Sequence, residues 1–398
     1  MQLVDIRKKL HSLAEIAHDE KETADFVVNQ LREVGVSDIR GGIGGYGLVA
    51  TTGGDKDGPS VLFRAELDAL PIDETIDVPY ASKKEGVSHK CGHDGHMAIL
   101  IGLARELQER PVRNGKVHFL FQPAEETGEG ATRMLEDDLL SNYKPDFIFA
   151  LHNLPGYPLH TVLLRDDVFA AGSSGLIVRL KGQAAHAAHP EYARSPASAV
   201  AGLIQEWQSL PQSVIPFDRA GLLTVIHARI GEQDFGTTPG YAELMATIRA
   251  HEPDDLDKLG ERAVALAETA ASRWGLKIDY EWTEVFQPTR NDPDAVALVE
   301  KVAKKLHGRG GDKVKNSGKA QKGDKSSRPV HEIIRLKQPF SWSEDFGRFT
   351  EKCPGALFGL GSGSDHPQMH DSRYDFPDEL LETGVRLFSG IIDEMGLR

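Results

Sequence analysis

Three short groups of potential metal ligands stand out in this sequence of 398 residues. The first is the segment Cys91-Gly92-His93-Asp94-Gly95-His96, which holds a thiol, two imidazoles and a carboxylate. The second is the pair Glu125 and Glu126, and the third is His152. Thiolate, imidazole and carboxylate groups bind zinc and related divalent ions. A further carboxylate beside such an ion can act as a general base. The three groups therefore predict a divalent-metal site with a base next to it.

Two other interpretations of the first group are a structural zinc site and a reactive thiol. A structural zinc site is usually closed by four Cys or His ligands in paired clusters. The sequence has only two cysteines, Cys91 and Cys353, so a second cysteine cluster is missing and no disulfide framework is expected. A thiol nucleophile would need a histidine base but no cluster of carboxylates. A catalytic metal site accounts best for all the residues together.

The adjacent carboxylates of Glu125 and Glu126 can divide two tasks. One can bind metal, while the other takes a proton from a water molecule whose pKa the metal lowers towards ~7. An isolated glutamate pair is more often a solvated part of a loop, and an isolated histidine such as His152 is more often a hydrogen-bonded core residue. The position of each group at the end of an apolar run favours the metal site.

Short apolar runs of strand length cover residues 61–65, 116–121 and 146–151, and a helix is predicted over 97–110. This alternation predicts an α/β catalytic domain with a mainly parallel sheet flanked by helices. The candidate ligands follow the carboxyl ends of the strands, where open α/β sheets place their sites.

Two further residues fit this site. Asp68 follows the first strand and could orient a ligand imidazole through a hydrogen bond. His370 follows the glycine-rich turn 359–363 and is a candidate ligand near the end of the chain.

The pattern of elements changes after Gly172. Strands are expected over 176–180, 220–230 and 242–249, and helices over 196–210 and 254–274. We therefore expect a catalytic metal-binding domain formed by residues 1–172 and 286–398. An inserted α+β domain is expected to occupy residues 173–285.

Charge and hydropathy narrow the range of partners. The formal net charge is −14, which argues against nucleic acid or an anionic membrane as the main partner. No apolar run approaches the ~20 residues that span a bilayer, and the N-terminal residues lack the apolar core of a signal peptide. A cytoplasmic location is expected. The basic segment 308–328 is expected to be a solvated loop, with a contact for an anionic partner as the alternative.

Taken together, the motifs resemble the two-metal aminoacylase/carboxypeptidase superfamily of metallopeptidases. Within it, the chain is most similar to the subfamily of hippurate hydrolases, bacterial N-acyl-amino-acid amidohydrolases and plant auxin-conjugate hydrolases. The resemblance covers nearly the whole chain and rests on segments 7–11, 22–24, 64–71, 91–96, 122–126, 151–152, 182–188, 343–346 and 370–376.

The resemblance implies a role for each site residue. The implied ligands of two divalent ions are Cys91 (as the bridge), His93, Glu126, His152 and His370. Glu125 is implied as general base and acid, and Asp68 as the support of a ligand. Zinc or manganese is expected first, although cobalt or nickel would also suit these ligands.

The inserted domain is implied to be a lid and dimerisation module. His186 would stabilise the oxyanion from the neighbouring subunit of a homodimer, while Arg249 and Ser343 would bind the small-molecule substrate. The expected activity is cleavage of the amide bond of N-acyl-amino acids by a metal-activated water.

Two departures from the family pattern lie in the inserted domain. The expected Asn is absent from Gly236-Thr237-Thr238-Pro239-Gly240, and Ala193-Arg194-Ser195-Pro196 replaces a Gly-x-Asp-Pro motif. Since this domain usually grips the substrate, two alternatives stay open: a dipeptidase, and a deaminase-like hydrolase of aromatic amines. A non-catalytic metal-binding protein is a third alternative, although such a protein would need no base like Glu125.

Overall fold

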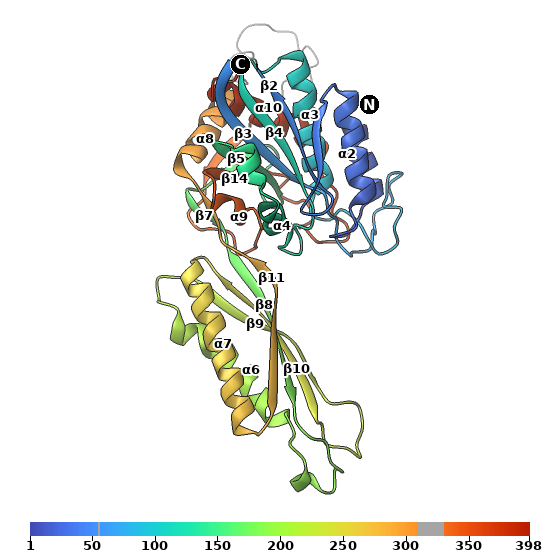
Figure 1. Ribbon diagram of the computed structural model, residues 1–398, viewed down its shortest axis with the longest axis vertical. Coiled ribbons are helices and arrows are strands. Elements are labelled where there is room, and N and C mark those ends of the chain that lie inside the picture. Colours follow the sequence, from blue (N-terminus) through green and yellow to red (C-terminus); the bar gives the residue numbers. More distant parts are fainter. Residues whose placement is uncertain (55, 309–329) are drawn as a thin grey trace. The chain divides into compact units, whose positions relative to one another are not determined.

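The apolar runs around residues 61, 117 and 148 form the centre of one large sheet (Figure 1). The structure is a computed structural model and describes residues 1–54, 56–308 and 330–398. Its contacts divide the chain into two units. Unit 1 contains Met1–Phe169, Thr289–Gln338 and Asp345–Arg398, and unit 2 contains Ala170–Pro288 and Pro339–Glu344. Residues 309–328 of the basic segment lie outside the described residues.

The large sheet of unit 1 has the strand order β1-β2-β4-β3-β5-β14-β6-β13. Its strands are β1 (Asp38–Ile43), β2 (Gly47–Gly53), β3 (Lys56–Glu66), β4 (Asn114–Gln122), β5 (Phe147–Leu154), β6 (Thr161–Leu164), β13 (Glu332–Arg335) and β14 (Gly355–Gly361). The four central strands β4, β3, β5 and β14 are parallel, whereas β2 and β6 run antiparallel to their neighbours β4 and β14. The carboxyl ends of the central strands therefore meet at one edge. A separate pair of strands, β7 (Asp167–Ala170) and β12 (Thr289–Asn291), completes the strands of unit 1.

Helices flank this sheet and bury its apolar faces. They are α1 (Leu3–Leu13), α2 (Lys21–Glu33), α3 (His93–Glu109), α4 (Gly130–Glu136), α5 (Leu139–Tyr143), α8 (Pro293–Gly308), α9 (Gly347–Thr350) and α10 (Leu380–Glu394). The ring of Phe388 on α10 lies 4.7 Å from Phe63 on β3 and 5.9 Å from Phe358 on β14. Aromatic packing of this kind fixes the helix against the centre of the sheet.

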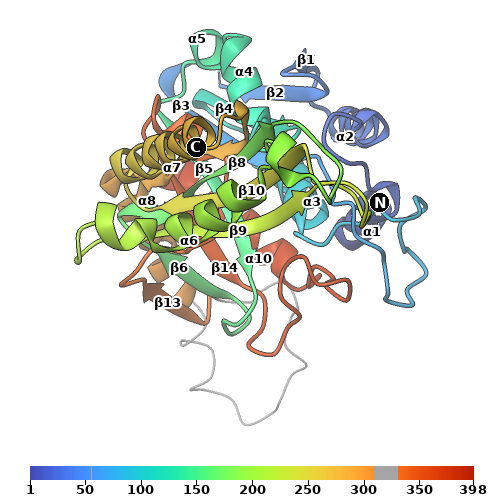
Figure 2. The same cartoon turned by 90° about the horizontal axis from the view of Figure 1, so that it is seen from below.

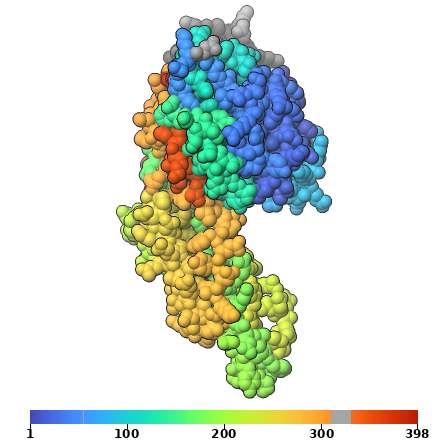
Figure 3. Space-filling model, viewed as in Figure 1, coloured from blue at the N-terminus to red at the C-terminus, as the bar shows by residue number. Residues whose placement is uncertain are grey.

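Unit 2 is an antiparallel sheet covered by two helices (Figure 1). The strand order is β11-β8-β10-β9, formed by β8 (Gly172–Lys181), β9 (Gly221–Ile230), β10 (Tyr241–Ala250) and β11 (Lys277–Phe286). The helices α6 (Ala197–Val214) and α7 (Pro253–Arg273) pack beside each other on the sheet (Figure 2). A short 3-10 helix covers Pro190–Tyr192. Residues 170–288 of this unit are coloured from green to orange in the space-filling view (Figure 3).

The structure differs from the sequence predictions at several boundaries. Residues 5–35, whose apolar positions recur at helical spacing, form two helices, α1 and α2, because the chain turns between Ala14 and Glu20. Helix α3 begins at His93 rather than at residue 97. The strand predicted over 146–151 extends to Leu154, so His152 lies inside β5.

Eight of the described strands were not predicted: β1, β2, β6, β7, β11, β12, β13 and β14. The segment Pro339–Glu344, which we had placed in the first domain, belongs to unit 2. Among the described residues, none of the helices is long and apolar enough to cross a bilayer.

Candidate metal centre

Three elements of unit 1 carry the predicted ligands to one place. Cys91 lies just before α3 and His93 is its first residue, with Gly92 between them at φ 101°. A Cβ atom at Gly92 would lie 2.3 Å from Oδ1 of Asn153, so only glycine fits there. The pair Glu125 and Glu126 follows the end of β4, and His152 lies near the carboxyl end of β5. The chain thus brings together groups that are far apart in sequence.

The predicted ligand atoms lie within a few ångströms of one another. Sγ of Cys91 is 3.5 Å from Nε2 of His152. Nε2 of His370 is 3.6 Å from Oε2 of Glu126, and the backbone N–H of His370 donates to the carbonyl of Lys90 at 2.8 Å. The ligand atoms form three overlapping triplets, each within 4.8 Å: Cys91, His93 and His152; Cys91, Glu126 and His370; His93, Glu125 and Glu126. All five predicted metal ligands and Glu125 therefore lie in one cluster.

The two buried histidines of this cluster are oriented by backbone carbonyl groups. Nδ1 of His93 donates to the carbonyl oxygen of Asp68 at 2.8 Å, and Nδ1 of His152 donates to the carbonyl of Asn153 at 3.0 Å. In the neutral form of both rings, these bonds leave the lone pair on Nε2, which is the form that binds a metal. The carboxylate of Asp68 also accepts a hydrogen bond from the N–H of Glu126 at 2.9 Å. Asp68 thus contacts both a ligand imidazole and the turn of the two glutamates.

The cluster has the properties of a cation site. Nε2 of His93 is buried and has no hydrogen-bond partner among the described residues, an arrangement that is costly unless another group binds there. Burial by itself lowers the pKa of His93. The hydrogen bond to Asp68 and the charges of Glu66, Asp68 and Glu126 outweigh burial and raise this pKa to about 10. The surplus of negative charge and the unused nitrogen both fit a divalent ion held by thiolate, imidazole and carboxylate groups.

His96 has a different task from the histidines of the cluster. Its Nδ1 is 2.7 Å from Oε2 of Glu66, and its Nε2 is 2.6 Å from Oδ1 of Asn153, so neither nitrogen is left for a metal. Asn153 also donates to the hydroxyl of Tyr374 at 2.6 Å and to the carbonyl of Cys91 at 2.9 Å. His96 and Asn153 therefore tie α3 to β5.

A buried charge network extends this support to β3. Arg64 pairs with Glu66, donates to Asp345 at 2.9 Å and to Gln122 at 2.8 Å. Burial tends to raise the pKa of Glu66, but the charges of Arg64, His96 and His93 hold it well below its usual range. Glu66, Asn153 and Asp345 were not among the predicted site residues. One sequence signal could have indicated them. Charged residues in or next to an apolar run of strand length, such as Arg64 and Glu66, are expected to need buried partners.

A second buried network lies around the first helix. Nδ1 of His11 is 2.8 Å from Asp94, and its Nε2 is 3.1 Å from Glu74. Arg7 pairs with Asp375 at 2.6 Å and with Asp94 at 3.4 Å. Burial lowers the pKa of His11, but its hydrogen bonds to Asp94 and Glu74 outweigh burial and raise the pKa to about 9. This network fixes the first turn of α3 from the side of the N-terminus.

The remaining predicted site residues belong to unit 2. His186 is exposed, and its Nδ1 accepts from the N–H of Ala188 at 3.1 Å, so the ring hydrogen is on Nε2. The hydroxyl of Thr238 accepts from the N–H of Ala185 at 2.8 Å. Thr238 lies where the family pattern has an Asn nearby, and here it fixes the loop that carries His186.

Arg249 and Ser343 contact each other within unit 2. Nη1 of Arg249 donates to the hydroxyl of Ser343 at 2.9 Å and to the carbonyl of Ser341 at 3.2 Å. Arg249 also lines a pocket of about 550 Å³ whose wall includes Leu222 and Phe340. Among the described residues, Arg249 forms no ion pair with a carboxylate, so much of its guanidinium group is left for a ligand.

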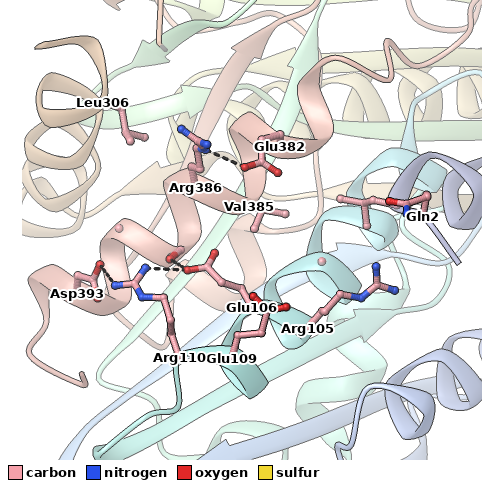
Figure 4. Close-up of a pocket in the computed structure, with 14 residues that line it drawn as sticks. Gln2, Arg105, Glu106, Glu109, Arg110, Leu306, Glu382, Val385, Arg386 and Asp393 are labelled. Carbon is pink, nitrogen blue, oxygen red and sulfur yellow. Dashed lines mark hydrogen bonds and ion pairs between the residues drawn. The ribbon is translucent and has the colours of Figure 1, made fainter. Parts of the chain in front are cut away.

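Unit 1 has a pocket of its own, of about 590 Å³, which lies between α3 and α10 (Figure 4). Several of its charged side chains pair with one another. Arg110 donates to Glu106 at 3.0 Å and to Asp393 at 3.3 Å, and Arg386 donates to Glu382 at 2.8 Å. None of the predicted ligands lines it. We therefore assign the chemistry to the ligand cluster and not to this pocket.

Comparisons with known proteins show the family of this chain. Peptidase family M20/M25/M40 matches residues 62–394. The N-acetyl-L-cysteine deacetylase of Bacillus subtilis (strain 168) is 32% identical over 370 residues, which is 93% of this chain and 82% of that protein. The N-acetyldiaminopimelate deacetylase of Geobacillus sp. (strain WCH70) is 28% identical over 398 residues, 99% of this chain and 98% of that protein.

A solved structure shows the same fold. The crystal structure of a dinuclear metal-binding peptidase of the M20 family from Bacillus subtilis superposes with a TM-score of 0.77. It is 25% identical and covers 98% of this chain and 96% of that one. These matches confirm the family and the α/β fold that the motifs indicated. The chain belongs to peptidase family M20/M25/M40 and is a metal-dependent hydrolase that acts on C–N amide bonds.

Proposed function

We propose that this enzyme releases the acyl group from N-acyl-amino acids at the cluster of unit 1. The observation that supports this most directly is the position of Glu125 beside the ligands, with its Oε2 3.8 Å from Nε2 of His93. A site that only bound metal would need no additional buried carboxylate there. The deacetylase activities named for the two relatives point to N-acyl-amino acids as the substrate class.

In this proposal Cys91, His93, Glu126, His152 and His370 hold two divalent ions. Zinc or manganese is the first expectation, with cobalt or nickel as further options for the same donor set. When bound, the ions would polarise the amide carbonyl and lower the pKa of the attacking water. Asp68 would keep His93 and the N–H of Glu126 in place through the two contacts described above.

Glu125 moves the proton. Its carboxylate accepts a proton from the attacking water as the oxygen adds to the amide carbon, and then donates this proton to the nitrogen of the leaving amine. The C–N bond breaks, and the products are a carboxylic acid and a free amino acid. Nε2–H of His186 would donate to the oxyanion that forms on the carbonyl oxygen.

Arg249 would bind the carboxylate of the substrate, and Ser343 would hold the guanidinium group in position. A guanidinium fork pairs well with a carboxylate because two parallel hydrogen bonds form. Burial lowers the pKa of Arg249, but an arginine keeps its charge at any physiological pH. The apolar wall formed by Leu222 and Phe340 suits an apolar amino-acid side chain.

A homodimer formed through unit 2 is part of the proposal. Strand β9 lies at an edge of the sheet and exposes three apolar side chains, Leu222 (55%), Ile226 (61%) and Ile230 (39%). An edge strand with such side chains readily pairs with another chain. In the dimer, His186 of one subunit would serve the cluster of the other. Cys91 and Cys353 form no disulfide with each other, which suits the reducing conditions of a cytoplasmic location.

Metal analysis together with a substrate panel tests the proposal. We expect about two divalent ions per chain, as the two-metal mechanism requires. We also expect loss of activity on chelation and hydrolysis of N-acetyl-amino acids in preference to dipeptides or aromatic amides. Preferential cleavage of dipeptides would make the enzyme a dipeptidase, and release of aromatic amines would favour the deaminase-like alternative. Metal-free protein with full activity would overturn the proposal.

A further inference from the structure

The turn that carries Glu125 and Glu126 is held by two buried carboxylates that belong to other parts of the chain. Asp68 accepts from the N–H of Glu126, as described above. Oε1 of Glu20 accepts from the N–H of Ala124 at 2.8 Å, although the two residues are 104 positions apart in the sequence. The two contacts fix alternate backbone amides of the turn, one on each side of Glu125.

Ala124 has an unusual backbone conformation. Its φ is 50°, in the left-handed region that residues with a Cβ atom rarely adopt. Ala124 is also completely buried. Such a residue stays in this conformation only where its surroundings enforce it, and strained residues of this kind cluster at active sites. The carbonyl of Ala124 accepts from the N–H of Gly130 at 3.0 Å and from the hydroxyl of Thr127 at 3.3 Å, both within the turn. The hydrogen bond from its N–H to Glu20 comes from outside the turn.

The carboxylate of Glu20 interacts with the backbone N–H groups of Glu20 itself and of His18, and across the fold with that of Ala124. Glu20 precedes α2 but makes no side-chain cap for that helix. It is completely buried, and its second oxygen, Oε2, has no hydrogen-bond partner among the described residues. Burial, together with the nearby charge of Asp68, raises its pKa to about 7. Burying a carboxyl group in this way is unfavourable, and of its backbone contacts only the one with Ala124 reaches the turn of the two glutamates.

The segment before α2 is itself anchored to the site. The carbonyl of Glu15 accepts from the N–H of Ala69 at 2.7 Å, next to Asp68. The carboxylate of Glu15 accepts from the N–H of Thr23 at 2.8 Å and from its hydroxyl at 3.0 Å. Glu20 therefore lies in a segment whose position is fixed by hydrogen bonds, and its own hydrogen bond to Ala124 fixes the turn relative to that segment.

We propose that Glu20 is a positioning residue that holds Ala124 in its left-handed conformation and thereby directs the carboxylates of Glu125 and Glu126 into the metal-ligand cluster. The role of Glu125 in this inference rests on the proposed function. Glu20 does not touch the substrate or the reacting atoms, and it acts only through the backbone of the turn.

Three variants test the contact by steady-state kinetics. Glu20→Ala removes the acceptor, and we expect kcat to fall ~100-fold with KM nearly unchanged, since misplacing a catalytic group by about 1 Å costs that much. Glu20→Gln keeps a side-chain carbonyl that can accept from Ala124, so its kcat should stay within about threefold of the wild type. Thr23→Val is the matched control, because it breaks a buried hydrogen bond of the same segment without touching the turn. It should lower the melting temperature but not kcat.

A double variant tests whether Glu20 acts through the conformation of Ala124. Glycine adopts φ 50° without strain. Adding Ala124→Gly to Glu20→Ala should therefore recover at least ~10-fold in kcat, which a general loss of stability would not allow. The inference is overturned if Glu20→Gln is as slow as Glu20→Ala, if Thr23→Val lowers kcat as much, or if the double variant recovers nothing.

Hydrogen exchange separates this inference from the proposed function. The amide of Ala124 should exchange faster in Glu20→Ala than in the wild type or in Thr23→Val, whatever the reaction of the enzyme is. Equal exchange rates would overturn the positioning role even in an active amidohydrolase. A wild-type protein that cleaves no N-acyl-amino acid but shows the expected exchange pattern would overturn the proposed function alone.

Discussion

The ligand cluster of unit 1 and the proposed substrate-binding side chains of unit 2 differ in how firmly the chain holds them. Cys91, His93 and His152 are buried, and backbone carbonyl groups orient both imidazoles. His186 is exposed, and Arg249 is held by the two hydrogen bonds that it donates to the loop of Ser341 and Ser343. Bond cleavage requires groups placed to within a fraction of an ångström, whereas substrate recognition tolerates groups that adjust on binding. The difference predicts that changes in unit 1 act on turnover and changes in unit 2 act more on recognition.

The largest effect is expected at Glu125. Glu125→Gln should keep its metal and its fold, but its kcat should fall ~10²–10⁴-fold because a general base is lost. Glu126→Gln should instead lose metal, as measured by elemental analysis. Glu129→Gln is the control, because Glu129 is an exposed glutamate that pairs with Arg133. If Glu125→Gln loses metal and Glu126→Gln retains it, the assignment of the two residues must be exchanged.

His186 tests whether unit 2 takes part in the chemistry. His186→Ala should lower kcat ~10²–10³-fold, the usual cost of losing an oxyanion donor. Mixing this variant with Glu125→Gln should restore part of the activity, because one site of a heterodimer would then contain both intact residues. The matched control is His189→Ala, an exposed histidine three positions along. Mixed subunits that exchange but stay inactive would contradict the arrangement across subunits.

The pH dependence of stability probes the buried network of unit 1. The folded-state pKa of His11, about 9, is above the ordinary value of 6.5. Its stabilising contribution is therefore complete below pH 6.5 and is lost as the pH rises to about 9. Over that range the free energy of unfolding should fall by about 3 kcal/mol more in the wild type than in His11→Gln. Urea unfolding at both pH values measures this difference.

The control for this pH effect comes from unit 2. His189→Gln changes an exposed histidine, and it should leave the pH dependence of the wild type unchanged. If the wild type and His11→Gln have parallel pH profiles, the hydrogen bonds of His11 to Asp94 and Glu74 do not stabilise the fold as the structure indicates.

Arg249 is expected to give the smallest effect. Arg249→Ala should raise KM for N-acyl-amino acids about 10- to 150-fold, the value of one hydrogen bond to a charged group. Amidated substrates, which lack the carboxylate, should be affected much less. Arg179→Ala is the control, because Arg179 lies on the neighbouring strand β8 but already pairs with Glu243 and Glu281. Equal losses for acidic and amidated substrates would show that Arg249 has another function.

Part of the cluster could be predicted from the sequence because several of its ligands are close to one another in the sequence or follow a recognisable strand. Cys91 and His93 are two positions apart, Glu125 and Glu126 are adjacent, and each group lies near the end of an apolar run. In a parallel sheet such ends meet, so strand prediction places Glu125, Glu126 and His152 together, whereas the complete ligand set with Cys91 and His370 was implied by the family resemblance. The same reasoning gave three of the four central strands of unit 1, β3, β4 and β5, and the two helices of unit 2.

The supports of the site could not be predicted because they depend on contacts between distant residues. Nothing near Glu20 in the sequence indicates that it reaches Ala124, and Asn153 reads as an ordinary neighbour of His152. The segment 339–344 joins unit 2 only through tertiary contacts, such as the hydrogen bond from Arg249 to Ser343. Strand β11 was missed because most of its residues are exposed, so it lacks the apolar run used to detect strands.

Gly92 shows how little room for sequence change this arrangement leaves. The single hydrogen atom of its side chain faces Asn153, the residue that bridges His96, Tyr374 and the carbonyl of Cys91. Even alanine would displace that amide and require a backbone conformation that alanine avoids. Position 92 therefore has no conservative replacement. Homologous enzymes could change their substrate by altering the exposed residues of unit 2, but any change at Gly92 would disturb α3 and β5 together.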